Sequence, residues 1–298
     1  MFKILLSYVF SFLILVSFAS AEESDEQAVK SELLNKASRF LEEKSLTFLP
    51  SGSTSEFALS GTENSKPIGH FVFVMPMKET NNGVFFNQTQ LNNYFLRGDD
   101  RQALNLGFGY RHLSDDNKYF LGVNTFYDVD SEKNQRASLG LEFHTTPFSA
   151  NANVYQKLSS PKIVGTYTET VVGGHDIKVS GQIPWLPWAS VNYTSYEWDK
   201  VNNSKSSKGD KISGKFYINN FVTMEVGTDN NNIDLSNDFA SVMFSYPPHN
   251  KPSLLSKPFT RQAFEASDVR RDLLMKVKRT NRLVVESANV GVVMARLD

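Results

Sequence analysis

The residues most able to do chemistry are few and widely scattered. The five histidines lack the spacing of metal ligands, and cysteine is absent, so thiol ligands and disulfides are excluded. The run from Asp229 to Asn232 offers oxygen atoms for weak calcium binding, but an Asn-rich surface loop accounts for it more simply. No serine-nucleophile elbow, phosphate loop or HExxH motif occurs. The sequence therefore predicts no enzyme, cofactor site or metal site. The histidines are His70, His112, His144, His175 and His249.

A set of charged residues lies in segments where polar and apolar side chains alternate. Side chains on a strand point alternately to two faces, so each charge would share its face with Gly, Ser and Asn. His112 and His144 are predicted to lie on the same polar faces. Burying a charge costs several kcal/mol unless it is paired, so we expect these residues to pair. The alternative is a water-filled space in which they stand free and set ion preference. The set is Arg111, Arg136, Glu142, Lys157, Lys178, Lys215 and Glu225.

The alternating segments predict about twelve strands, an even number, as in closed bacterial outer-membrane barrels. Turn-forming clusters separate them, and some links are short whereas others are long and polar. The stretch from Ser159 to Gly174 is read as one long link. The predicted strands are 55–62, 68–76, 83–92, 102–113, 117–129, 134–145, 147–158, 174–183, 187–199, 209–219, 221–229 and 237–246.

The N-terminus predicts export. Residues 1–21 hold a lysine, an apolar run and the small residues Ala19-Ser20-Ala21, which together indicate a signal peptide cleaved after Ala21. The segment 22–50 is predicted to be periplasmic, with one amphipathic helix over 24–45. No later apolar run reaches the roughly 20 residues of a spanning helix. The net charge of −1 argues against a nucleic-acid partner.

Two all-β folds fit residues 51–246. The polar face carries many small residues rather than the Lys and Glu expected beside bulk water, which favours a narrow lumen. Tyr and Trp near predicted strand ends, such as Tyr127 and Trp188, fit the aromatic girdles of a membrane barrel. We therefore predict an antiparallel transmembrane β-barrel of about twelve strands in outer-membrane lipid. A secreted β-sandwich with an aromatic core remains the alternative.

The tail, residues 247–298, is predicted to thread back through the pore. Prolines after Tyr246 end the strand pattern, and Thr260 could cap a charged helix running to about Lys278. We expect this helix to plug the lumen, with Arg270, Arg271 and Asp272 meeting the lumen charges. An extended segment from Asn281 onward would then reach the far side.

Several motifs resemble one family, the translocator domain of the intimin/invasin inverse autotransporters. The resemblance extends over about residues 55–287. It implies an outer-membrane barrel of a Gram-negative bacterium that exports a C-terminal adhesive passenger. It also implies the barrel-assembly machinery and periplasmic chaperones as partners. The motifs are Asn105–Arg111, Leu121–Asp130, Ser138–Glu142, Asn153–Tyr155, Gly174–Ile177 and Arg279–Glu286.

The resemblance departs at the C-terminus. In that family the tail usually continues into immunoglobulin-like domains, whereas this sequence stops at Asp298, and Ser287 replaces an expected aromatic residue. We therefore expect the pore apparatus of a reduced translocator without its adhesin. The alternative function is a small passive porin, or a structural barrel, whose tail stays in the periplasm.

Overall fold

A computed structural model describes residues 52–62, 68–199, 206–232, 237–249 and 251–289. The predicted signal peptide at 1–21 and the helix predicted within 22–50 lie outside these residues. Within them the structure is all-β, with one 3₁₀ turn and no α-helix.

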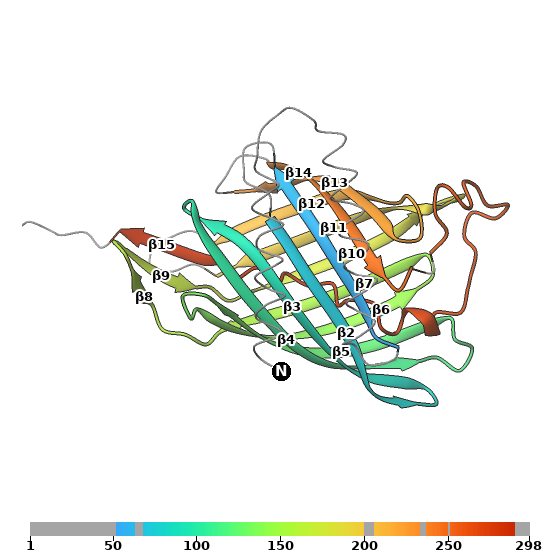
Figure 1. Cartoon of the computed structure of the whole chain (residues 1–298), viewed down its shortest axis with the longest axis horizontal. Helices are drawn as coiled ribbons and strands as arrows, with labels where there is room; N and C mark the ends of the chain where they lie inside the picture. The colour runs from blue at the N-terminus through green and yellow to red at the C-terminus, as the bar shows by residue number, and fades with distance from the viewer. Residues whose placement is uncertain (1–51, 63–67, 200–205, 233–236, 250, 290–298) are drawn as a thin grey trace, which may run out of the picture.

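Twelve antiparallel strands close into a barrel, as the sequence predicts (Figure 1). β1 completes the ring by pairing with β14, from Ser55↔Tyr246 to Thr62↔Phe239. Closure leaves no edge strand, so backbone groups along the strands find partners within the sheet. The strands are β1 Thr54–Thr62, β2 Ile68–Thr80, β3 Gly83–Leu96, β4 Asp99–Leu113, β5 Tyr119–Asp130, β6 Gln135–Thr145, β7 Phe148–Lys157, β10 Gly174–Ile183, β11 Leu186–Trp198, β12 Ser207–Tyr217, β13 Val222–Asn231 and β14 Asn237–Tyr246.

The two ends of the barrel differ. At one end, called the turn end, short links join the strands, such as residues 81–82 between β2 and β3. At the other, called the loop end, the links include the long stretch 158–173 between β7 and β10. The start of β1 and the end of β14 both lie at the turn end (Figure 1). The tail that follows β14 therefore also begins there.

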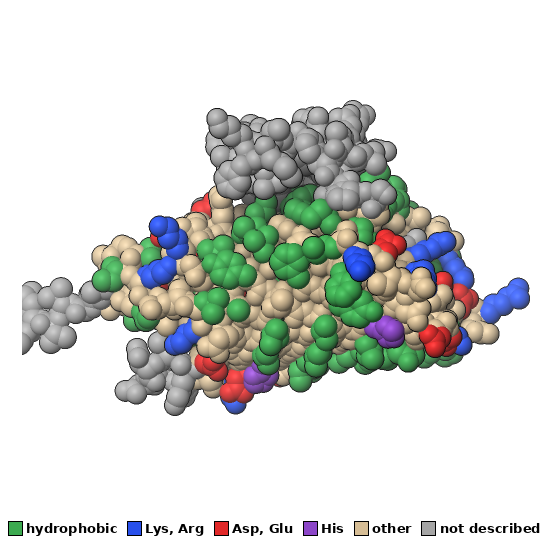
Figure 2. Space-filling view, turned by 90° about the horizontal axis from the view of Figure 1, so that it is seen from below, with side chains coloured by type: hydrophobic (Ala, Val, Ile, Leu, Met, Phe, Trp, Pro, Cys, Tyr) green, Lys and Arg blue, Asp and Glu red, His purple; other side chains and the backbone are tan. Residues whose placement is uncertain are grey.

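The alternating pattern places apolar side chains outside and polar side chains inside. Leu139 and Leu141 of β6 are each 63% exposed, whereas Arg136, on the opposite face of that strand, is fully buried. Figure 2 shows hydrophobic side chains over the middle of one wall and most of the charged side chains toward its two ends. A soluble sandwich would bury the apolar face instead, so the barrel is built for contact with lipid.

Glycines on the inner face make room for aromatic rings from neighbouring strands. A Cβ at Gly107 would overlap the ring of Phe126, and one at Gly109 would overlap the ring of Phe86. Both pairs lie opposite one another in the ladders of β4 with β5 and with β3. The Gly-x-Gly spacing in β4 therefore lets two large apolar side chains lie flat inside the barrel.

A small second sheet stands at the loop end. β8 Lys162–Val164 and β9 Tyr167–Val171 form a hairpin, and β15 Val285–Asn289 of the tail pairs with β9 (Figure 1). The link predicted from 159 to 174 as a single loop thus contains two short strands. Gly165 in the hairpin turn has a φ of +60°, a conformation that glycine adopts readily.

The helix predicted from Thr260 to about Lys278 is wrong. Thr260 donates its hydroxyl to the carbonyl of Gln262 instead of capping a helix. Within 251–289 the one helical element is the 3₁₀ turn η1, Arg270–Asp272. The tail instead follows the rim of the turn end and touches successive links between strands. The contacts are Leu254 to Tyr217, Thr260 to Trp185, Ser267 to Thr146, Val269 to Asn117 and Arg270 to Asn81.

The barrel itself takes the hydrogen bonds that a tail helix would have made internally. Arg111 donates to the carbonyls of Leu273 and Met275, and Gln88 accepts from the amide of Val277. Because these backbone groups already have partners on the barrel, the tail satisfies them without a helix. Among the described residues, no helix is long and apolar enough to cross a membrane.

Candidate functional site in the occupied lumen

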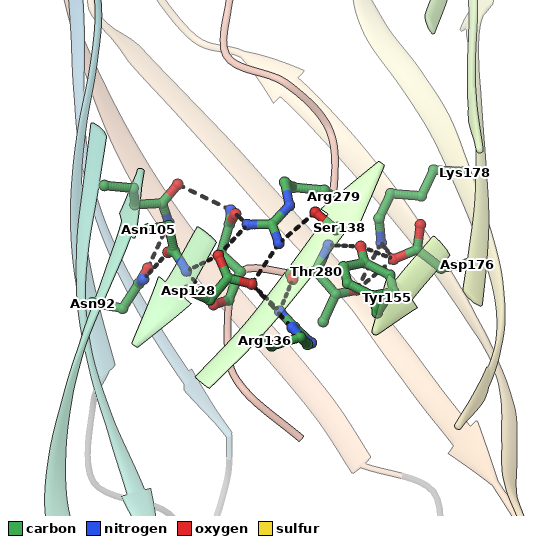
Figure 3. Close-up of polar contacts among 12 residues, drawn as sticks. Asn92, Asn105, Asp128, Arg136, Ser138, Tyr155, Asp176, Lys178, Arg279 and Thr280 are labelled. Atoms are coloured by element: carbon green, nitrogen blue, oxygen red, sulfur yellow. Dashed lines mark hydrogen bonds and ion pairs between the residues drawn. The ribbon is translucent and has the colours of Figure 1, made fainter. Parts of the chain in front are cut away.

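Residues 273–284 of the tail run through the barrel and are called the lumen segment. They enter at the turn end beside η1 and leave at the loop end, where β15 begins. Their partners lie mainly on β3 to β7 and β10, so the segment follows one wall of the lumen (Figure 3). The lumen of the described barrel is thus occupied by the chain itself.

Asp128 of β5 is the central charge of this site. Its carboxylate is fully buried and binds two arginines, Arg136 of β6 and Arg279 of the lumen segment. Arg279 binds it through both terminal nitrogens, at 3.0 and 2.6 Å, and Asn105 also donates to it at 2.7 Å. Two-point Arg–carboxylate pairing fixes distance and orientation together. Asp128 therefore fixes the lumen segment at one position along the pore.

A second carboxylate, Asp176 of β10, holds the next residue. Thr280 donates its hydroxyl to Asp176 at 2.7 Å, and its amide donates to the hydroxyl of Tyr155 at 2.8 Å. Tyr155 in turn donates to Asp176 at 2.8 Å. On the other side, Arg136 donates to the carbonyl of Thr280 at 2.7 Å. Thr280 is thus bound through both its main chain and its side chain, by Asp176, Tyr155 and Arg136 (Figure 3).

Arg111 of β4 binds the lumen segment near its start. The guanidinium pairs with Glu142 of β6 at 2.8 Å and donates to the carbonyls of Leu273 and Met275, each at 2.7 Å. It also lies over the ring of Phe86, 4.4 Å from the centroid. A fully buried guanidinium with an ion pair, two carbonyls and a ring face has its charge well compensated.

Apolar side chains of the tail fit between these polar contacts. Val277 packs with Val74, Phe86 and Phe126. Nearer the loop end, Leu283 packs with Tyr94, Ala103 and Val171. Fully burying such a side chain contributes about 1.5–3 kcal/mol. The segment is therefore held by alternating polar and apolar contacts along the pore.

A buried cluster at the loop end joins the β8–β9 hairpin to the barrel. The carboxylate of Glu169 in β9 accepts from Arg97 at 2.8 Å, from Arg101 at 2.7 Å and from Asn134 at 3.0 Å. Burial opposes ionisation of Glu169, but these three donors outweigh it and hold its pKa below the ordinary value. Arg97 also lies over the ring of Tyr167, 4.0 Å from its centroid.

Asp272 of η1 anchors the tail at the turn end. It binds His144 at 2.9 Å and Lys251 at 3.1 Å. Burial opposes its ionisation, but the hydrogen bond from His144 and the charge of Lys251 lower the pKa of Asp272 to about 2. Beside it lies a cavity of about 430 Å³ between the tail and the walls of β1, β2 and β12.

The structure brings some of the predicted residues together and separates others. Arg111, Arg136 and Glu142 meet in the buried contacts above, and Lys178 lies 3.5 Å from Asp176. Lys215 and Glu225 lie on the opposite wall, where Lys215 faces the ring of Tyr217 and Glu225 accepts from Ser213 at 2.5 Å. Asp272 contacts His144 of the barrel.

Four residues predicted to lie inside the pore lie elsewhere in the structure. Lys157 shares the inward direction of β7 but is the last residue of the strand, so its side chain is exposed at the loop end. Arg270 and Arg271 are exposed at the turn-end rim instead of lying inside the pore, because the tail enters the lumen only after η1. His112 points outward, because it shares the direction of Phe108 and Tyr110 in β4; His144 points inward as predicted.

The sequence reasoning missed Asp128, Asp176, Arg279 and Thr280, which form the buried contacts at the centre of the lumen. Asp128 and Asp176 lie on the polar faces of predicted strands, so the alternation contained their signal. Arg279 lay at the predicted end of a helix and was not assigned a partner. Among the described residues, no group of three or more His, Asp and Glu side chains could hold a metal ion. The arrangement provides ion pairs and hydrogen bonds that hold a polypeptide.

The chain matches one protein family over most of its length. Residues 15–247 match the family described as inverse autotransporter, beta-domain. An attaching and effacing protein homolog from Escherichia coli (strain K12) is 36% identical over 133 residues, which is 42% of this chain and 43% of that protein. The chain thus matches less than half of that relative's length.

One solved structure shows a similar fold. A membrane protein structure from work on in-meso crystallization matches with a TM-score of 0.65 and 19% identity, over 79% of this chain and 99% of the other. An outer membrane channel from Pseudomonas putida F1 is more distant, with a TM-score of 0.49 and 9% identity over 66% of this chain and 97% of the channel. At these identities the likeness concerns the fold alone.

Proposed function

The chain belongs to the inverse autotransporter β-domain family of Gram-negative outer-membrane barrels, and from this premise we propose that it exports its own C-terminal segment. The barrel anchors the chain in the outer membrane. The lumen segment spans the pore, and the residues that follow it lie at the cell surface.

The path of the lumen segment carries this proposal. The tail starts at the turn end, beside the last residue of β14, and β15 lies beyond the opposite end of the barrel. Short links face the periplasm in barrels of this kind, and longer ones face outward. The tail therefore crosses the membrane from inside to outside without a spanning helix.

The lumen contacts supply both the anchor and the seal. Asp128, Asp176 and Glu142 bind arginines and polar groups that project from the tail and the wall. Removing one partner of a buried ion pair costs about 3–5 kcal/mol, so a segment held by several such contacts leaves the pore rarely. No nucleotide is needed to retain it, because folding of the segment against the wall provides the free energy.

The exported segment is further proposed to serve attachment. This step rests on the partial likeness to the attaching and effacing protein homolog. Assembly of the barrel would use the barrel-assembly machinery and periplasmic chaperones that serve outer-membrane barrels of this family. The porin alternative needs a free lumen, whereas Arg279 and Thr280 occupy its centre.

An epitope fused after Asp298 tests export directly. We expect antibody to bind intact cells that carry this fusion. The matched control carries the same epitope after Ala266, an exposed residue of the turn-end rim, and should bind antibody only after the outer membrane is permeabilised. Detection of the Asp298 fusion only after permeabilisation would favour a barrel with a periplasmic tail.

Single-channel conductance separates a plugged translocator from a porin. The intact chain should conduct rarely in planar bilayers, whereas a chain lacking residues 260–298 should form a stable open pore. Equal conductance of the two forms would rule out the lumen segment as the seal.

A further inference from the structure

The β8–β9 hairpin meets the tail at the point where the tail leaves the lumen. β15 lies antiparallel to β9 from Val285↔Val171 to Asn289↔Tyr167. Beside this ladder, the amide of Val172 donates to the carbonyl of Val284 at 3.0 Å. The side chains of β15 are only partly buried or exposed. Backbone hydrogen bonds, more than side-chain pockets, therefore join the tail to the hairpin.

One set of contacts fixes the hairpin to the barrel without any tail residue. Glu169 of β9 is buried against Arg97, Arg101 and Asn134, which lie in three other segments of the loop end. None of these contacts involves a tail residue. A strand edge that is already ordered binds an extended peptide at a lower entropic cost than a mobile loop does.

We propose that the β8–β9 hairpin is a strand-addition site that catches the exported chain as it leaves the lumen. Its ligand is an extended stretch of the same chain, which in this structure is residues 285–289. The inference rests on the proposed function, because it requires the tail to pass through the pore. Since strand addition depends on the main chain, successive stretches of different sequence can pair with β9 in turn. Each pairing opposes movement back into the lumen.

The ladder predicts which tail amides matter. In an antiparallel pair, hydrogen-bonded residue pairs alternate with non-bonded ones. The bond from Val172 to Val284 makes that pair a bonded one. The register then directs the amides of Glu286 and Ala288 toward β9, and those of Ser287 and Asn289 toward the other edge of β15.

Proline substitutions in the two alternating directions form a matched pair. The double variant Glu286→Pro, Ala288→Pro removes the amides that face β9. The control Ser287→Pro, Asn289→Pro removes amides that face away, where proline is tolerated on an edge strand. We measure hydrogen–deuterium exchange across 167–172 in the full-length barrel in lipid nanodiscs. The first variant should speed exchange about tenfold or more, and the control should stay near the parent.

The functional readout is the rate at which an epitope after Asp298 becomes accessible on intact cells after induction. E286P/A288P should slow it severalfold relative to S287P/N289P. Equal exchange or equal display rates in the two variants would overturn the inference, while export in both would leave the proposed function standing. If the parent chain shows no surface epitope at all, the proposed function itself is wrong, and the exchange experiment still reports whether β9 holds the tail.

Discussion

Asp128 is the lumen residue whose loss should release the tail most effectively. Asp128→Asn removes the one carboxylate that binds both Arg136 and Arg279, so two buried guanidiniums lose their counter-charge. Leaving a buried charge unpaired costs about 3–5 kcal/mol. Arg279→Met should cost less, about 1–3 kcal/mol, because Asp128 keeps Arg136 and Asn105 as partners.

The two substitutions should not be additive. In D128N/R279M the unpaired tail guanidinium is gone, so the double variant should hold its tail better than D128N alone, by about 1–2 kcal/mol. This ordering follows only if both residues act through one shared contact. A general weakening of the barrel would instead make the double variant the least stable.

Planar-bilayer recording measures these differences. When the lumen segment leaves the pore, current flows, so the open fraction reports the equilibrium between seated and released tail. A cost of 3 kcal/mol raises the open fraction by about two orders of magnitude. Heat-dependent gel mobility checks that each variant barrel is folded. Equal open fractions for D128N and R279M, with an additive double variant, would refute the reasoning.

Three further results are expected. Glu169→Gln should speed hydrogen exchange in 162–171, because Arg97 loses its carboxylate partner and Arg101 keeps only Glu132, 4.0 Å away. Glu132→Gln, at a side chain that is 41% exposed, should not. Leu141→Arg, at the middle of the lipid face, should destabilise the folded barrel by about 2–4 kcal/mol. Leu158→Arg, at the loop end, should destabilise it by about 1 kcal/mol or less. Urea unfolding in lipid vesicles measures both. The pKa of Asp272 is depressed to about 2, so its contacts with His144 and Lys251 hold the tail at the turn end above about pH 4 and are lost as pH falls through about 2. Channel recordings that show release of the tail between pH 7 and 5 would contradict this assignment.

The barrel could be predicted from the sequence because alternation is a local property. Leu121 and Val123 alternate with Gly122 and Asn124, so one face of β5 is largely apolar. An even number of such segments needs only closure to remove the last two edges. Neither step depends on which distant residues meet.

The lumen contacts depend on the strand register and on the path of the tail. The alternation of apolar and polar residues predicts neither. Val269, Leu273 and Val277 are spaced by four residues, the spacing of a helix face. In the structure the first two flank the 3₁₀ turn η1 and pack into one apolar cluster of the wall. Val277 packs into the next cluster, and no α-helix joins the three residues. The helical spacing thus reflects the positions of apolar patches on the barrel wall.

Short strands at the loop end were missed for a related reason. β8 has three residues and β9 has five. Both strands are too short to show the two-residue alternation of apolar and polar side chains. β9 is held because Glu169 is buried against Arg101 of the barrel, and the tail strand β15 pairs with its other edge. Both partners lie far away in sequence.

Cysteine labelling tests the crossing of the membrane most directly. The chain has no native cysteine, and Ala288 of β15 and Ala266 of the turn-end rim are both exposed. With a membrane-impermeant maleimide, Ala288→Cys should react on intact cells, and Ala266→Cys only after the outer membrane is permeabilised. The opposite pattern, or reaction of Ala288→Cys only after permeabilisation, would contradict the passage of the tail to the cell surface.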